Sequence, residues 1–105
     1  MNNANKLKVT ILLPIYDNDD EPFEQDIYDW FADEIQRIFP EGATEYGGLA
    51  TGWWHGKKDL SRCIWAIVEE DRLSVIREFL REAKGKFRQV KMYFEYHPTT
   101  YEEVG

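Results

Sequence analysis

The sequence predicts an α+β fold in which one antiparallel sheet is covered on one face by two helices. Stretches in which apolar residues alternate with other residues indicate strands, and apolar residues recurring every three or four positions indicate helices. Two of the predicted strands are separated by only a short turn, which is typical of an antiparallel hairpin. A chain of 105 residues is long enough for one such domain. We therefore expect a single domain over 1–105, with flexible tails at 1–6 and 99–105.

The first strand and the first helix are predicted in the N-terminal part of the chain. Alternating apolar residues predict a strand over 8–16. An acidic turn follows, and Pro22 stands where the first turn of a helix tolerates proline. The helix is expected to run to about Phe39, because Pro40 and Gly42 would end it. Its apolar stripe consists of Phe23, Ile27, Phe31, Ile35 and Ile38.

A hairpin, a second helix and a last strand are predicted in the rest of the chain. The hairpin joins strands over 44–55 and 61–69 by a turn at 56–59. Asp71 is the expected N-cap of the second helix, and Gly85 is the expected residue just after its end. The last strand is expected over 89–97, with Pro98 ending it.

The order strand, helix, strand, strand, helix, strand is the split βαβ, or ferredoxin-like, pattern. Because both helices cover one face of the sheet in this pattern, the other face is expected to be open. We expect this open face to carry either Trp53 or Trp54, which are adjacent in the sequence. The other residues expected on it are Leu12, Tyr16, Tyr93 and His97. The third strand adds one of two alternating sets, and the sequence does not decide between Cys63, Trp65 and Ile67 or Ile64, Ala66 and Val68.

The segment 47–56 contains four glycines and the adjacent Trp53 and Trp54. Glycine inside a strand indicates a bulge or a close approach by another group. Neighbouring strand residues point to opposite faces, so the two tryptophans would serve two surfaces, one of which needs a partner or a ligand. A purely structural interpretation is equally open, since bulges often only shape a sheet.

The net charge of −7 argues against binding to a nucleic-acid backbone, which requires clustered lysine and arginine. Acidic residues gather in 17–34 and basic residues in 72–91. We interpret these as two solvated helix surfaces of opposite sign; an inhibitor that presents its acidic surface to a basic partner protein is the alternative. The single Cys63 allows no intrachain disulfide, and no apolar run is long enough to cross a bilayer, so a cytoplasmic protein is expected.

Residues with catalytic chemistry are few. His55 and Asp59 flank the predicted turn and are the one candidate pair for a general base oriented by a carboxylate. Cys63 lies in an apolar strand, where thiols are usually inert. No metal site is predicted: the calcium-loop-like start at Asp17 has Pro22 in place of the required glycine, and its expected glutamate is a tyrosine. No cofactor is expected.

The whole chain resembles the ferredoxin-like units that pair as dimeric α/β barrels, in which two sheets face each other around a cavity. In that superfamily the cavity variously holds haem, aromatic substrates or nothing known. The segment 39–44, Phe-Pro-Glu-Gly-Ala-Thr, followed by Gly52 and Trp53, also resembles a small bacterial family of unknown function. Neither resemblance assigns a catalytic residue.

These observations favour a non-catalytic binding domain that forms a homodimer through its open sheet face. A small apolar or aromatic ligand is expected at a site formed by Tyr16, Trp53, Trp54, Trp65, Tyr93 and His97. The alternative is a small-molecule enzyme of the dimeric barrel type with an aromatic cavity. An acidic inhibitor of a basic protein is the third hypothesis.

Overall fold

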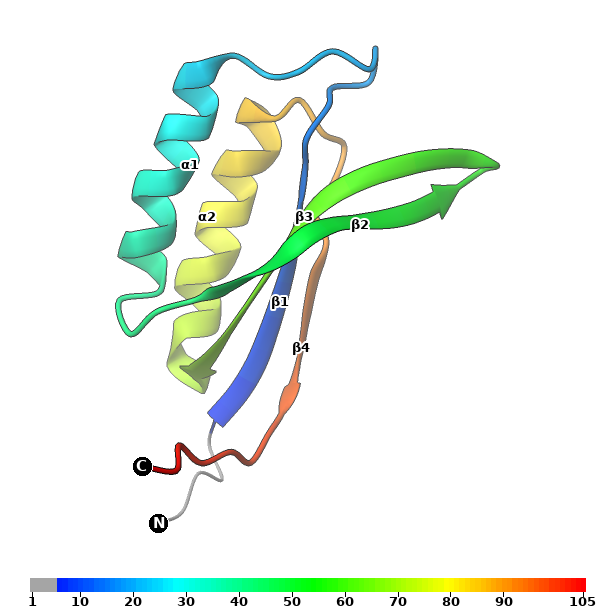
Figure 1. Ribbon diagram of the computed structural model, residues 1–105. Helices are drawn as coiled ribbons and strands as arrows, with labels where there is room; N and C mark the ends of the chain where they lie inside the picture. The colour runs from blue at the N-terminus through cyan, green and yellow to red at the C-terminus, as the bar shows by residue number, and fades with distance from the viewer. Residues whose placement is uncertain (1–5) are drawn as a thin grey trace.

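The computed structural model describes residues 6–105, apart from the side chain of Trp54. Its elements are β1 (Lys6–Pro14), α1 (Gln25–Ile38), β2 (Thr44–Trp54), β3 (Lys57–Glu69), a short 3₁₀ turn (Glu70–Arg72), α2 (Leu73–Lys86) and β4 (Phe94–Pro98). The sheet has the strand order β2-β3-β1-β4, and every neighbouring pair is antiparallel. Both helices lie on one side of this sheet (Figure 1). The predicted α+β, ferredoxin-like fold is confirmed.

The core fills the space between the sheet and the helices. The strands contribute the buried side chains of Val9, Ile11, Leu13, Ile64, Ala66 and Val68. At the centre of the helix layer, Phe79 is fully buried and its ring stacks on Trp30 with the centroids 5.5 Å apart. Because Ile64 and its alternate neighbours face the helices, Cys63, Trp65 and Ile67 lie on the open face. The structure thus decides between the two sets that the sequence left open.

The segment between β1 and α1 corrects two predicted boundaries. β1 ends at Pro14, and Tyr16 beyond it forms an isolated bridge with Pro22. Pro22 is therefore part of this turn, and the helix begins at Gln25. Tyr28 closes the turn, because its hydroxyl donates a hydrogen bond to the carbonyl of Ile15 at 2.9 Å. The start of α1 therefore depends on a contact between Tyr28 in the helix and Ile15 in the preceding turn. The sequence pattern of either segment alone does not contain this contact.

The ends of α2 also differ from the predictions. Asp71 lies in the 3₁₀ turn and makes no side-chain cap, so its predicted role as N-cap is wrong. Gly85 lies inside the helix, and Arg88 is the residue that adopts the left-handed conformation beyond it, with φ 52°. The buried ring of Phe87 anchors this end, and its N–H donates to the carbonyl of Ala83 at 2.8 Å.

The last strand begins later than predicted. The N–H of Gln89 donates to the carbonyl of Lys84 at 2.9 Å, so the chain is still completing the end of α2 at this point. The strand β4 starts at Phe94 and pairs with β1 through Pro98. Beyond it, the N–H of Thr99 donates to the carbonyl of Lys6 at 3.1 Å, which holds the start of the C-terminal segment against β1.

The hairpin between β2 and β3 has a shorter turn than predicted. His55 and Gly56 form the whole turn, both with positive φ, at 51° and 75°. Two consecutive residues with positive φ are characteristic of a type I′ turn, whose twist matches that of the two strands it connects. β3 consequently begins at Lys57. The register shifts between Glu45 and Leu49, which confirms the irregularity that the glycines in β2 indicate.

Among the described residues 6–105, no helix is long and apolar enough to cross a membrane.

We predict that Gly42→Ala and Gly47→Ala lower the free energy of unfolding by different amounts. Gly42 has φ 110°, so Gly42→Ala should lower the free energy of unfolding by about 1–2 kcal/mol, because an L side chain strains this conformation. Gly47 has no such φ, and an added Cβ would meet nothing within 4 Å. Gly47→Ala should therefore change stability by less than about 0.5 kcal/mol. Urea unfolding of the two variants measures both values, and equal losses would contradict the prediction.

Candidate binding site on the open face of the sheet

The open face of β3, β1 and β4 carries three rows of side chains. The central row places Thr10 of β1 between Trp65 of β3 and Glu95 of β4. Side chains directly opposite each other on neighbouring antiparallel strands lie about 5 Å apart, so this row is continuous. Rows of Ile67, Lys8 and His97 on one side and of Cys63 and Leu12 on the other extend it. We call these residues, together with Tyr93, whose hydroxyl contacts Glu95, the open-face site.

The open-face site combines an aromatic ring with charges of both signs. The ammonium nitrogen of Lys8 lies 4.6 Å from the ring centroid of Trp65, which is a cation–π contact. The hydroxyl of Tyr93 donates a hydrogen bond to a carboxylate oxygen of Glu95 at 3.1 Å. Flat rings and paired polar groups of this kind suit contact with another surface or with an aromatic ligand.

Two titratable groups of the open-face site, the thiol of Cys63 and the phenol of Tyr93, are favoured in their protonated forms. Burial raises the pKa of the Cys63 thiol, and the nearby carboxylate of Glu95 raises it further against the opposing effect of Lys8. The hydrogen bond to Glu95 raises the pKa of the Tyr93 phenol. Neither group is therefore activated as a nucleophile or base at neutral pH, because the thiolate is the reactive form of cysteine.

The structure brings together three of the residues predicted for the site and separates others from them. Trp65, Tyr93 and His97 belong to the open face. Tyr16 is 44% exposed in the turn beyond β1, outside the three rows. Trp53 is 71% exposed on the part of the hairpin that extends past the sheet, and the side chain of Trp54 lies outside the described residues.

Three members of the site were missed in the sequence. Lys8, Thr10 and Glu95 occupy the open face beside the aromatic residues. The signal was present, since strand alternation places residues 8, 10 and 12 on one face.

The candidate catalytic pair lies away from the open-face site. His55 is the first residue of the hairpin turn, and Asp59 lies opposite Gly52 on the ribbon below it. Both residues are exposed. A general base acts on a substrate that is bound beside it. Neither His55 nor Asp59 lines the hollow at the end of α1 or the groove between α1 and β2.

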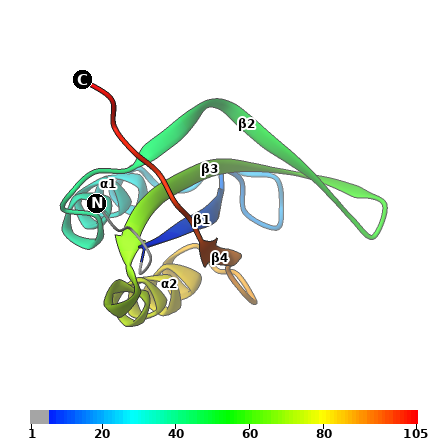
Figure 2. The same cartoon turned by 90° about the horizontal axis from the view of Figure 1, so that it is seen from below.

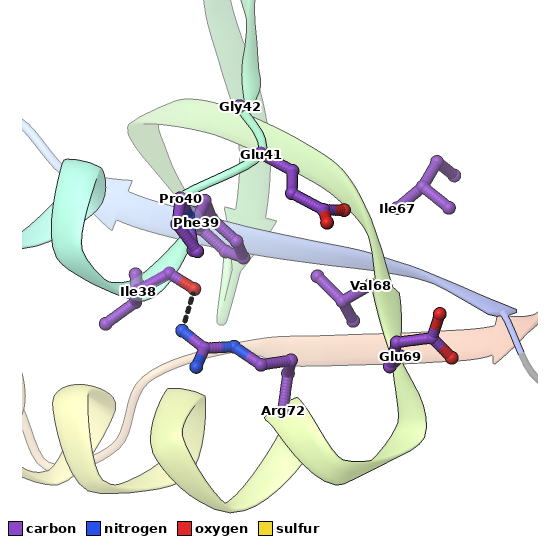
Figure 3. A pocket seen from close by; sticks show the side chains of 9 residues that line it. All are labelled: Ile38, Phe39, Pro40, Glu41, Gly42, Ile67, Val68, Glu69 and Arg72. Carbon is purple, nitrogen blue, oxygen red and sulfur yellow. Dashed lines mark hydrogen bonds between the residues drawn. The ribbon is translucent and has the colours of Figure 1, made fainter.

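A hollow of about 90 Å³ lies where the end of α1 meets the end of β3, and Figure 3 shows the residues that line it. Arg72 forms one wall, and its guanidinium donates a hydrogen bond to the carbonyl of Ile38 at 2.6 Å. The cation thus satisfies the C-terminal end of α1, where helix carbonyls lack partners. This contact gives Arg72 a structural role.

A wider groove of about 280 Å³ lies between α1 and β2. Its lining includes the ion pair of Arg62 with Glu45, and the guanidinium of Arg62 lies 5.2 Å from the ring centroid of Phe31. Most of the other lining side chains are apolar.

Part of the acidic run is compensated within the chain. Arg88 contacts Asp17 at 3.5 Å and Glu24 at 3.4 Å. Two backbone N–H groups donate to the carboxylate of Asp17, which lowers its pKa, and Arg88 lowers it further. Asp26 and Asp29, by contrast, are exposed on α1. The acidic and basic segments thus contact each other at Arg88.

Comparisons with known proteins show the fold of this chain. No family model matches it, and no curated protein matches it in sequence. A solved structure of a phage SAM lyase in complex with S-methyl-5′-thioadenosine is similar, with a TM-score of 0.54 and 12% sequence identity. The similarity covers 90% of this chain and 82% of the lyase chain. At this identity the likeness extends to the arrangement of strands and helices and not to the residues of a site.

Proposed function

We propose that the protein is a non-catalytic binding domain that associates with a second copy of itself through the open face of the sheet. The observation that supports this proposal is the row of Trp65, Thr10 and Glu95, which is bordered by half-buried Ile67 and Leu12. In the described chain, residues 6–105, both helices pack on the opposite face (Figures 1 and 2). Neighbouring apolar and aromatic side chains on an uncovered sheet face are typical of an interaction site.

The edges of the sheet favour a contact between faces over a contact between edges. The edge strand β4 has only five residues, and the edge strand β2 is interrupted by its register shift. Short and bulged edge strands are poor templates for pairing with another chain. The open-face site also carries Lys8 and Glu95, so a second copy can oppose unlike charges across the interface.

We expect Trp65→Ala to weaken the association at least about tenfold, since a central tryptophan often contributes most to an interface. The matched control is Tyr96→Ala, because Tyr96 is an aromatic residue on β4 whose ring contacts Arg77 on the helix side. Light scattering over a hundredfold range of concentration measures the mass of each form. A wild-type protein that stays monomeric throughout would overturn the proposal.

A second candidate is an enzyme that acts on a small molecule, and the likeness to the phage SAM lyase supports it. The test incubates the wild-type protein with S-adenosylmethionine and follows the release of S-methyl-5′-thioadenosine by chromatography. Turnover that Glu95→Gln or His55→Ala abolishes without unfolding the protein would replace the non-catalytic proposal. No release above the uncatalysed rate would set this candidate aside.

A further inference from the structure

The outer part of the β2–β3 hairpin extends beyond the sheet as a two-stranded ribbon. The last strand pairing of β1 joins Pro14 to Ser61, and Ser61 in turn pairs with Ala50. In the described part of the chain, residues 51–54 and 57–60 have strand pairings only with each other. We call residues 51–60 the arm. Figures 1 and 2 show the arm leaving the sheet on the side away from the helices.

Within the described residues 6–105, the strands of the arm pair with each other, and the N–H of Ile15 donates a hydrogen bond to the carbonyl of Leu60 at the base of the arm at 3.4 Å. An isolated two-stranded hairpin is at best marginally stable in water. Trp53 on the arm is 71% exposed and lies opposite Lys58, so its ring is largely in contact with solvent. Leaving so much of an indole exposed forgoes about 1.5–3 kcal/mol of burial free energy, which contact with another molecule would recover.

The arm lies where it would meet a molecule that is seated on the open face of the sheet. The arm extends on the same side of the sheet as the open-face site. A second copy seated on that face would therefore lie against the arm.

The size of a dimer interface favours a contribution from the arm. β1 pairs with β3 over nine residues and with β4 over only five, so the open face is small. A stable interface engages about 20–30 residues on each partner, whereas the open-face site has nine. The arm adds residues 51–60, among them the exposed Trp53.

The tip of the arm is positively charged, whereas a second copy of the chain has a net negative charge. The tip, residues 53–58, carries Lys57 and Lys58 and no acidic residue, whereas the whole chain has a net charge of −7. A second copy therefore attracts the tip, and this attraction weakens as salt increases.

We propose that the arm of each copy lies along the other copy, with Trp53 buried against it, so that two arms clasp the dimer reciprocally. This inference rests on the proposed association through the open face and adds the segment that completes the interface. A two-fold axis repeats every contact, so each variant removes two arm contacts from the dimer.

The test compares three variants by light scattering and by the dimer dissociation constant. Trp53→Ala should raise the dissociation constant at least about tenfold. The double variant Lys57→Glu and Lys58→Glu should raise it as well, by a larger factor at low salt than at high salt. Tyr16→Ala is the matched control, because Tyr16 is an exposed aromatic residue outside both the arm and the open-face site.

Hydrogen exchange gives an independent readout of the arm. The amides of residues 51–60 should exchange more slowly in concentrated than in dilute wild-type protein, as dimer forms. One outcome would overturn the arm proposal alone: Trp65→Ala dissociates the dimer, but the arm variants have the dissociation constant of the wild type and the amides of residues 51–60 exchange equally fast in dilute and concentrated protein. The proposed association through the open face would then stand. If the wild type is monomeric at every concentration, both are overturned. Circular dichroism confirms that each variant is folded.

Discussion

Phe79→Ala should lower the free energy of unfolding by about 3–5 kcal/mol, as is typical when a fully buried aromatic ring is removed. The ring of Phe79 is completely buried and stacks on Trp30 at 5.5 Å between centroids. It also contacts Phe31, with the centroids 5.9 Å apart. The substitution therefore leaves a cavity at the point where α1, α2 and the sheet meet, and the surrounding rings cannot fill it without moving.

The loss would be a large part of the total stability of a small domain, so Phe79→Leu provides a milder second variant. Urea unfolding of both variants measures the effect, and the leucine variant should lose less because it fills more of the space. Val90→Ala is the control, since Val90 is 88% exposed and should change stability by less than about 0.5 kcal/mol. Equal stability of Phe79→Ala and the control would contradict this account of the core.

Arg72→Met should lower the free energy of unfolding by about 1.5–3 kcal/mol, which is the range for a hydrogen bond from a charged donor. The guanidinium of Arg72 donates to the carbonyl of Ile38 at 2.6 Å, and to that of Arg37 at 3.4 Å. Methionine keeps much of the volume but leaves these carbonyls at the end of α1 unsatisfied. The loss is reduced because Nε of Arg72 is buried and lacks a hydrogen-bond partner among the described residues.

Arg81→Met is the matched control for Arg72→Met. Arg81 forms an ion pair with Glu78, but its side chain is 66% exposed, and such surface pairs contribute about 0–1 kcal/mol. Urea unfolding should therefore separate the two arginine variants clearly. A cost for Arg72→Met no greater than that for Arg81→Met would show that the hydrogen bonds to the end of α1 do not stabilise the fold.

The order of the elements could be predicted from local patterns, whereas several boundaries could not. The alternation in β1 and the apolar stripe of α1 each identify an element, because a strand and a helix repeat with different periods. The start of α1 depended on Tyr28, whose hydroxyl reaches back to Ile15. The end of α2 depended on the burial of Phe87. Contacts of this kind join separate parts of the chain, so a pattern within one segment does not contain them.

The candidate site was predicted in part. Trp65, Tyr93 and His97 were named from the sequence and lie on the open face. Lys8 and Glu95 were missed, because only the register across β3, β1 and β4 shows which residues are neighbours. Trp53 was assigned to the same site, yet the extension of the hairpin past Pro14 places it on the arm.

The sequence by itself determined the fold class, because hydrophobic periodicity selects which residues each strand or helix can bury. It also determined that one face of the sheet would be open, since two helices on one side leave the other uncovered. Only the tertiary structure decided that Trp65 rather than Ile64 lies on that open face. Both alternating sets of β3 are apolar, so each could be buried equally well, and only the packing of the helices against Ile64, Ala66 and Val68 distinguishes them.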